Sequence, residues 1–262
     1  MLNDMQFETR IQDDNDFLAT CDLPDCDHVS HITPRLGGFN IDEKNPEAWS
    51  MGNTIVAITA GMSEYNKGII KDSIQLASIA ATNRFPQDGV ERYGHFLRVL
   101  TTCGWFSQSS GMSDYQVRDR RFTMEQAALE VLKSAIAAAA LPGPTSLLLL
   151  NVAKDAVAAL QNDEAKRSLF DQHSKTYSGG TFTIASSAES ADGEVVMAMG
   201  ALDFSSSLNI TNVLFWEWSN STVRIKRAQN HLTLNQVQYE RVRRTVEAKL
   251  TEYSNEAINE LF

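Results

Sequence analysis

The chain has 262 residues, of which 43% are hydrophobic and 21% are charged, and its formal net charge is −10. These values exclude a disordered chain, and the acidic balance argues against nucleic-acid binding and against electrostatic docking on an anionic membrane. The N-terminus has no basic segment that leads into an apolar one, so the sequence predicts no signal peptide. We expect a soluble protein, cytoplasmic as made, whose release would follow a route independent of a signal peptide.

Residues 1–50 are predicted to form an irregular, acidic N-terminal segment. Four side chains in it can ligate a metal, namely Cys21, Cys26, His28 and His31. Their spacing fits no zinc site, because a single residue separates Cys26 from His28, where zinc patterns place a longer arm before the histidines. We therefore expect no metal and no other cofactor. Whether Cys21 pairs with Cys26 is left open.

Residues 52–173 are predicted to be mainly helical. A short run of β-branched and apolar residues over 52–61 indicates a buried strand, and apolar spacings of three and four indicate helices over 64–84 and 90–106. Cys103 lies on the apolar face of the second helix. We interpret it as a structural thiol, with a reactive or lipid-modified cysteine as the alternative.

A helical hairpin from Thr123 to His173 organises the chain. Thr123 and Gln126 form a capping-box pattern at its start. The helix ends at a Pro-Gly-Pro sequence, where the prolines interrupt the hydrogen-bond ladder and Gly143 permits the reversal. We expect Thr145 or Ser146 to cap the return helix, which would continue to about residue 172. One broad face of that helix is apolar, formed by Leu149, Val152, Ala153, Ala156, Val157 and Leu160.

The turn of the hairpin carries no charged residue from Ser134 to Ala153. A helix that is apolar nearly all round is buried on several sides, by protein or by lipid. The prolines split the uncharged run into halves too short to cross a bilayer, so we expect no conventional transmembrane helix. The candidate membrane-contacting residues are Leu141, Pro142, Leu147, Leu148, Leu149 and Leu150.

Residues 178–262 are predicted to form an antiparallel meander followed by a helix. The expected strands are 181–187, 194–203, 208–218 and 222–227, with a turn at Asp192-Gly193. Trp216 and Trp218 would share one face of a strand, as core or cross-strand partners or, alternatively, as a ligand-stacking pair.

The last helix is predicted to begin with a capping box at Thr233 and Gln236 and to carry an apolar stripe from Tyr239 to Leu261. We expect it to lie across the meander. The fold class that follows is α+β: a helical region with a central hairpin, packed with a mainly antiparallel sheet of four or five strands and a long C-terminal helix. Residues 1–262 would form a single compact domain.

The sequence contains no complete catalytic, metal or nucleotide motif. We interpret the chain as a non-enzymatic, membrane-active or host-directed protein, toxin-like or a virulence factor, whose apolar hairpin contacts a lipid membrane or a host protein. Two alternatives stay open. One is a self-assembling structural or protein-interaction module, including a homo-oligomer, and the other is an enzyme with a site assembled from distant residues.

Overall fold

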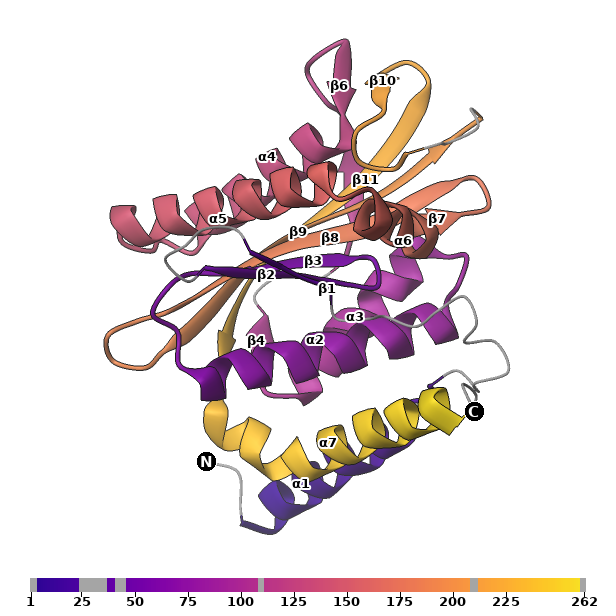
Figure 1. The fold of residues 1–262 in the computed structure, drawn as a ribbon. Helices are drawn as coiled ribbons and strands as arrows, with labels where there is room; N and C mark the ends of the chain where they lie inside the picture. Colours follow the sequence, from indigo (N-terminus) through magenta and orange to yellow (C-terminus); the bar gives the residue numbers. More distant parts are fainter. Residues whose placement is uncertain (1–3, 24–36, 41–45, 108–110, 208–211, 260–262) are drawn as a thin grey trace.

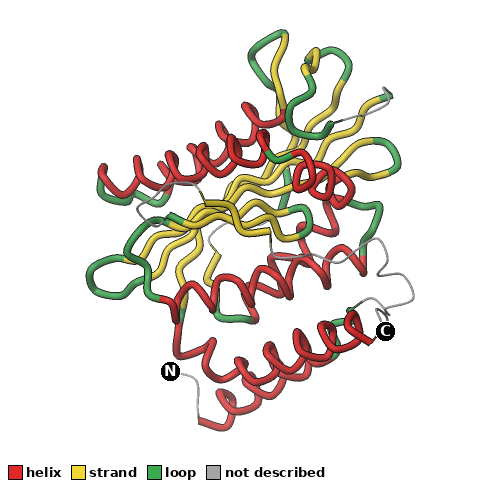
Figure 2. The backbone as a smooth tube through the Cα atoms, viewed as in Figure 1, coloured by secondary structure: helices red, strands yellow, loops and turns green. Residues whose placement is uncertain are grey.

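The computed structural model describes residues 4–23, 37–40, 46–107, 111–207 and 212–259. It shows an α+β protein in which helices cover both faces of one mixed sheet (Figures 1 and 2). The helices are α1 (Asp4–Ala19), α2 (Glu64–Arg84), α3 (Gly89–Thr102), α4 (Met124–Ala138), α5 (Gly143–Asn162), α6 (Glu164–Ser174) and α7 (Gln236–Asn259). The strands are β1 (Gly37–Asn40), β2 (Glu47–Met51), β3 (Thr54–Ile58), β4 (Trp105–Ser107), β5 (Ser113–Tyr115), β6 (Arg121–Thr123), β7 (Lys175–Thr176), β8 (Gly179–Glu189), β9 (Val195–Ser206), β10 (Glu217–Ser219) and β11 (Val223–Leu234).

The main sheet has the order β1-β2-β3-β8-β9-β11-β4, with β5 added on β11 and β7 on β8. The pairing of β3 with β8 is parallel and the other pairings are antiparallel. The sheet is thus mainly antiparallel, as predicted, but it contains more than the four or five strands expected. The extra strands come from the first third of the chain and from segments of two or three residues, which carry too little pattern to be recognised.

The molecule has four layers (Figure 1). Helices α4 and α5 cover one face of the sheet, α2 and α3 cover the other, and α1 and α7 pack outside α2 and α3. Alternate residues of β9 therefore enter two different apolar clusters. Ala198 and Leu202 face α4 and α5, whereas Met197 and Met199 face the other helices. Because both faces are covered, β3 is buried at every position, which explains why its sequence is apolar without alternation.

Several predicted elements are confirmed. The strand predicted over 52–61 contains β3, and α2 occupies the predicted range of 64–84. The N-cap of α4 is Thr123, whose hydroxyl accepts a hydrogen bond from Gln126 N at 3.2 Å while the Gln126 side chain accepts one from Thr123 N at 3.1 Å. The predicted apolar face of the return helix coincides with the buried residues of α5.

The turn of the hairpin differs from the prediction. Helix α5 begins at Gly143 with Pro142 as its N-cap, so Thr145 and Ser146 lie within the helix and do not cap it. The left-handed residue of the reversal is Ala140, with φ of 51°, and not Gly143. The return helix also ends earlier than expected, at Asn162. Asp163 then accepts a hydrogen bond from Lys166 N at 3.0 Å and starts α6 as a separate helix.

The N-terminal segment was predicted to be irregular, and that prediction was wrong. Residues 4–19 form α1, whose sequence is too polar to show a helical apolar stripe. Tertiary contacts with α7 hold it in place: the Asn15 amide donates a hydrogen bond to the carbonyl of Arg241 at 3.4 Å, and the Thr245 hydroxyl donates one to the Asn15 side chain. Packing overrides weak local propensity here.

Three further predictions about the C-terminal part were wrong. Strand β11 continues to Leu234, so Thr233 is a strand residue, and the N-cap of α7 is Asn235, whose side chain accepts a hydrogen bond from Gln238 N at 3.1 Å. Helix α7 packs on α1 and α2, because α2 and α3 already occupy that face of the sheet. The strand predicted over 208–218 is also absent from the meander. Residues 208–211 lie outside the described residues, and β10 pairs with β6 outside the main sheet.

Candidate functional site

The connection between α4 and α5 forms an apolar tip at the left end of the upper helical layer in Figure 1. We call residues 139–150 the hairpin tip. Leu147 is 64% exposed and Leu148 is 54% exposed, while Leu141 and Leu150 are half-buried and Pro142 is exposed. Leu149 differs from these five candidates, because it is fully buried against the sheet with the rest of the apolar face of α5.

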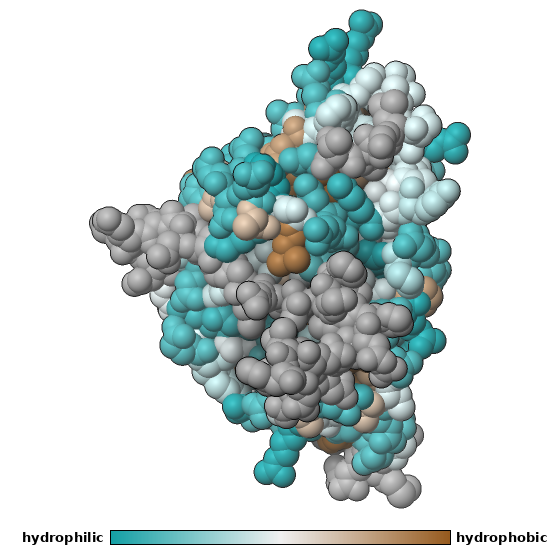
Figure 3. All heavy atoms as spheres, turned by 45° about the vertical axis from the view of Figure 1, so that its right-hand side comes forward, coloured by the Kyte–Doolittle hydropathy of each residue, from teal (hydrophilic) through white to brown (hydrophobic). Residues whose placement is uncertain are grey.

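The opposite end of the molecule has a different surface. Figure 3 brings that end forward, and its described residues are mainly hydrophilic, with hydrophobic residues in small separate spots. Two adjacent exposed leucines are unusual beside this background, because isolated exposed apolar residues are normal while clustered ones mark interaction surfaces. The nearest charged residues along the chain are Lys133 and Lys154, both exposed, which flank the uncharged stretch.

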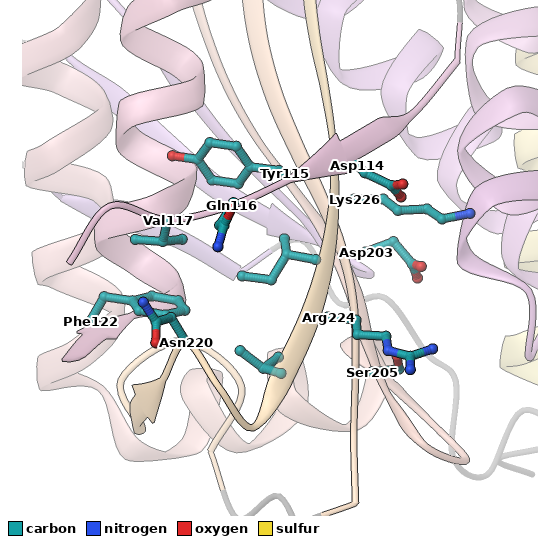
Figure 4. Close-up of a pocket in the computed structure, with 12 residues that line it drawn as sticks. Asp114, Tyr115, Gln116, Val117, Phe122, Asp203, Ser205, Asn220, Arg224 and Lys226 are labelled. Atoms are coloured by element: carbon teal, nitrogen blue, oxygen red, sulfur yellow. The ribbon is translucent and has the colours of Figure 1, made fainter. Parts of the chain in front are cut away.

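A second feature is a groove inside a β-ribbon near one end of β11. The segments 113–123 and 217–227 pair antiparallel at both ends, where β5 pairs with residues 225–227 and β6 pairs with β10. Both ends keep the same register, since residues 116–120 and 220–224, five on each strand, lie between them. A groove of about 600 Å³ lies beside these stretches (Figure 4), and we call it the ribbon groove. At the β6 end the strands stay paired, since Asn220 N donates a hydrogen bond to the carbonyl of Arg120 at 3.2 Å.

The residues at the ribbon groove lie on two sides of β11 and differ in chemistry (Figure 4). The residues labelled on one side of β11 are Tyr115, Gln116, Val117, Phe122 and Asn220, and those on the other side are Asp114, Asp203, Ser205, Arg224 and Lys226. The division follows from strand alternation, because neighbouring residues of β11 point to opposite faces. Val223 and Ile225, which also line the groove, pack with Tyr115, Val117 and Phe122 in the apolar cluster on the α4–α5 side.

Asp203 is a half-buried charged group of the groove. A Cβ atom on Gly89, the first residue of α3, would lie 1.9 Å from Oδ1 of Asp203, so this carboxylate meets the start of the helix where only glycine fits. Burial and the nearby Asp88 carboxylate raise the pKa of Asp203, and Lys226, its cross-strand neighbour, acts in the opposite direction. The helix N-terminus and the lysine offset only part of the cost of charging this half-buried acid.

Of the predicted thiol and metal residues, the structure describes Cys21 and Cys103. Cys103 is fully buried, and burial raises the pKa of its thiol, so in this conformation it has the features of a structural cysteine. Cys21 is buried as well, whereas Cys26, His28 and His31 lie outside the described residues. Across the part of the chain that the structure describes, no three Cys, His, Asp or Glu side chains are grouped to hold a metal ion.

The two tryptophans do not form a pair. Trp218 of β10 is buried and packs edge-on against Phe204, with ring centroids 5.4 Å apart. Trp216 precedes the strand and is 40% exposed. The prediction of a shared face fails because residue 216 is in a turn, where strand alternation does not apply. Ligand stacking by Trp216 alone stays a prediction.

Comparison with known proteins identifies no family for this chain. No family model and no curated protein matches the chain. Among solved structures, the chain is similar to a delta-endotoxin, with a TM-score of 0.39 and 13% identity over 71% of this chain and 81% of that one. It is also similar to the Evf virulence factor, with a TM-score of 0.31 and 13% identity over 86% of this chain and 87% of that one. At these TM-scores the likeness is loose, so neither protein's action is transferred to this chain.

Proposed function

We propose that this is a non-enzymatic, membrane-active and host-directed protein that docks on a lipid surface through the hairpin tip. The observation that carries the proposal is the exposure of Leu147 and Leu148 inside a stretch of 20 residues without charge, Ser134 to Ala153. An apolar tip flanked by lysines suits the boundary between acyl chains and headgroups. The leucines would enter the acyl region, and Lys133 and Lys154 would remain near the phosphates.

The expected affinity is modest. Full burial of a leucine side chain stabilises by about 1.5–3 kcal/mol, and both leucines are a little over half exposed, so the pair would contribute about 2–4 kcal/mol. That is less than a single myristoyl chain supplies, and one such chain already gives only reversible binding. The proposal therefore predicts weak docking that a second contact or a high local concentration would have to strengthen.

The packing of the hairpin favours docking of the tip over insertion of whole helices. Leu149 and the rest of the buried face of α5 lie against the sheet, and lifting α5 away would expose both surfaces to water. Lys154 and Asp155 follow within the same helix. Among the described residues, no helix is both long and apolar enough to span a membrane.

The net charge favours one kind of membrane. A formal net charge of −10 is repelled by an anionic surface, and the cytoplasmic leaflet of a cell membrane is anionic. A weakly charged outer leaflet presents no such barrier. This charge argument supports a toxin-like or virulence role, in which the protein meets a target cell from outside.

Flotation with neutral phosphatidylcholine vesicles tests the proposal. We expect the protein to float with the vesicles, and both Leu147→Asp and Leu148→Asp to reduce the floating fraction strongly without lowering the melting temperature, because both side chains are exposed. Val237→Asp is a matched control, since Val237 is 62% exposed on α7, in the opposite outer layer. Equal flotation of all four proteins would show that the tip does not bind lipid. Loss of self-association in the tip variants, with no flotation of the wild type, would favour the protein-interaction alternative.

A further inference from the structure

A small pocket lies where the end of α1 meets α2 and α3, and we call it the three-helix pocket. Phe17 of α1 and Asp22, which follows α1, line it together with Arg84 of α2 and with His95 and Arg98 of α3. Its volume is about 220 Å³. Sites for drug-sized ligands are larger, at roughly 300–1,000 Å³, so this pocket has room for a compact ligand.

Aromatic contacts position the nitrogen-bearing side chains of the pocket. The His95 ring meets Phe17 and Phe85 edge-on, with ring centroids 6.0 and 5.9 Å away. The Arg98 guanidinium lies over Phe17, 4.2 Å from its centroid, and the Arg84 guanidinium lies over Phe85 at 5.7 Å. Each arginine therefore packs on a ring that also contacts His95, which holds the three groups around one cavity.

These three side chains are available to a ligand. Among the described residues, Arg84, His95 and Arg98 contact aromatic rings but make no hydrogen bond and no ion pair. Both arginines are exposed and His95 is half-buried. Their N–H groups are satisfied by water or by a ligand that displaces the water.

The pocket has an excess of positive charge, although the chain has a formal net charge of −10. Its lining residues include two arginines and one carboxyl group, that of Asp22, which is exposed. Burial lowers the pKa of His95, and the charges of Arg84 and Arg98 lower it further. The two arginines thus act on the same imidazole, and an anion in the cavity would offset their mutual repulsion.

The donors fit a tetrahedral oxyanion. A phosphate monoester has three free oxygens and a charge of about −1.5 to −2 at pH 7. Two guanidinium groups and an imidazole can each donate to a different oxygen, and the two positive charges match the charge of the ester. A carboxylate has two oxygens and a single charge, which one arginine already satisfies. The donor set therefore favours phosphate over carboxylate.

We propose that the three-helix pocket binds the phosphate group of a small soluble ester, with Arg84 and Arg98 as charged donors and His95 as a third hydrogen-bonding group. The proposal does not rest on lipid docking by the hairpin tip, because α1, α2 and α3 lie on the other side of the sheet from α4 and α5 (Figure 1). A bound ester would contact three helices and stabilise the packing of α1 on α2 and α3.

An NMR titration of the full-length protein with labelled histidines tests this site. We expect the His95 ring signals, identified by their loss in His95→Gln, to shift when inorganic phosphate replaces chloride at constant ionic strength. Arg84→Gln and Arg98→Gln should each weaken phosphate binding about tenfold, as loss of one charged hydrogen-bonding group would. Arg118→Gln, at an exposed position between β5 and β6, is the matched control and should titrate as the wild type does.

Glycerol phosphate and phosphatidic acid vesicles distinguish the two sources of a phosphate group. We expect glycerol phosphate to shift the His95 signals as inorganic phosphate does, and phosphatidic acid vesicles not to bind the protein through the pocket. Flotation with phosphatidic acid vesicles that Arg84→Gln and Arg98→Gln abolish would overturn the soluble source and assign the phosphate to a lipid headgroup.

Two other results would overturn the site itself. One is a set of His95 signals that phosphate leaves unchanged. The other is equal phosphate affinity in the wild type and in the folded arginine variants, checked by thermal unfolding. Flotation of both arginine variants with neutral vesicles should equal that of the wild type, which separates this test from that of the hairpin tip.

Discussion

The two outer helical layers of the molecule are built in different ways. The α4–α5 layer packs directly on the sheet through apolar side chains, such as Leu149 and Val152 against Phe182 and Ile184. The α1–α7 layer packs on α2 and α3, and it includes half-buried polar groups next to its apolar stripe. The comparison teaches that a helix pair packed on a sheet can have an apolar interface and an apolar tip. A helix pair packed on other helices, by contrast, accommodates carboxylates.

The polar contacts of the α1–α7 layer are specific. The Gln238 amide donates a hydrogen bond to Asp14 at 2.8 Å, and the Tyr239 hydroxyl lies 3.4 Å from Oδ2 of Asp72. Burial is the main cause that raises the pKa of both carboxyl groups. This layer should therefore respond to pH, whereas the apolar interface between α5 and the sheet should not.

The largest effect is expected in the α4–α5 layer. Leu149→Ala should lower the free energy of unfolding by about 2–5 kcal/mol, because it leaves a cavity in a fully buried site. Leu148→Ala, one residue earlier, should change it by less than about 0.5 kcal/mol, because that side chain is exposed. Urea unfolding of both variants measures the difference. Similar values for the two would mean that the tip and the buried face are not distinct.

An intermediate effect is expected in the α1–α7 layer on acidification. The folded pKa of Asp14 and of Asp72 is raised above the unfolded value, so the folded protein takes up protons first. The contribution of these two carboxyl groups to the free energy of unfolding should then rise as the pH falls from 7 toward about 4. It should not increase further once the pH is below their unfolded pKa.

Thermal unfolding at pH 7 and pH 5 checks this sign. The wild type is compared with the double variant Asp14→Asn, Asp72→Asn. When the pH is lowered from 7 to 5, the wild type should gain stability relative to this variant. Asp155→Asn, at an exposed position of α5, is the control. A wild type that loses stability relative to the double variant at pH 5 would contradict the account.

The smallest effect is expected at the turn of the hairpin. Ala140 holds a φ of 51°, a left-handed conformation that costs a residue with a Cβ about 1–2 kcal/mol. Ala140→Gly removes that cost but increases the freedom of the unfolded chain, so we expect a net gain of no more than about 1 kcal/mol. Differential scanning calorimetry would show a small rise in melting temperature, and a fall would mean that the turn is not strained.

The sequence predicted the fold where the pattern was long and local. The range of α2, the capping box at Thr123 and the buried face of α5 follow from helical spacing and capping chemistry, which neighbouring residues determine. Helix α1 and the position of α7 depend instead on which surfaces other elements leave open. No local pattern records that information, so these parts could not be derived from the chain alone.

The candidate sites divide in the same way. The hairpin tip was recognised because its uncharged stretch is continuous in sequence, although only the structure separates exposed Leu147 and Leu148 from buried Leu149. The ribbon groove left no signal. Its walls come from segments about 100 residues apart, and its strands β5, β6 and β10 are three residues long. The two segments can be matched residue by residue only when the strand register is known.

The most direct test of the central claim places a polarity-sensitive fluorophore on the hairpin tip. Leu148→Cys in a Cys26→Ser background would carry the label, since Cys21 and Cys103 are buried, and Val237→Cys in the same background would report on the opposite layer. We predict a blue shift and a gain in intensity at position 148 when neutral phosphatidylcholine vesicles are added, and no change at position 237. An unchanged spectrum at position 148, or the same change at both positions, would contradict docking through the tip.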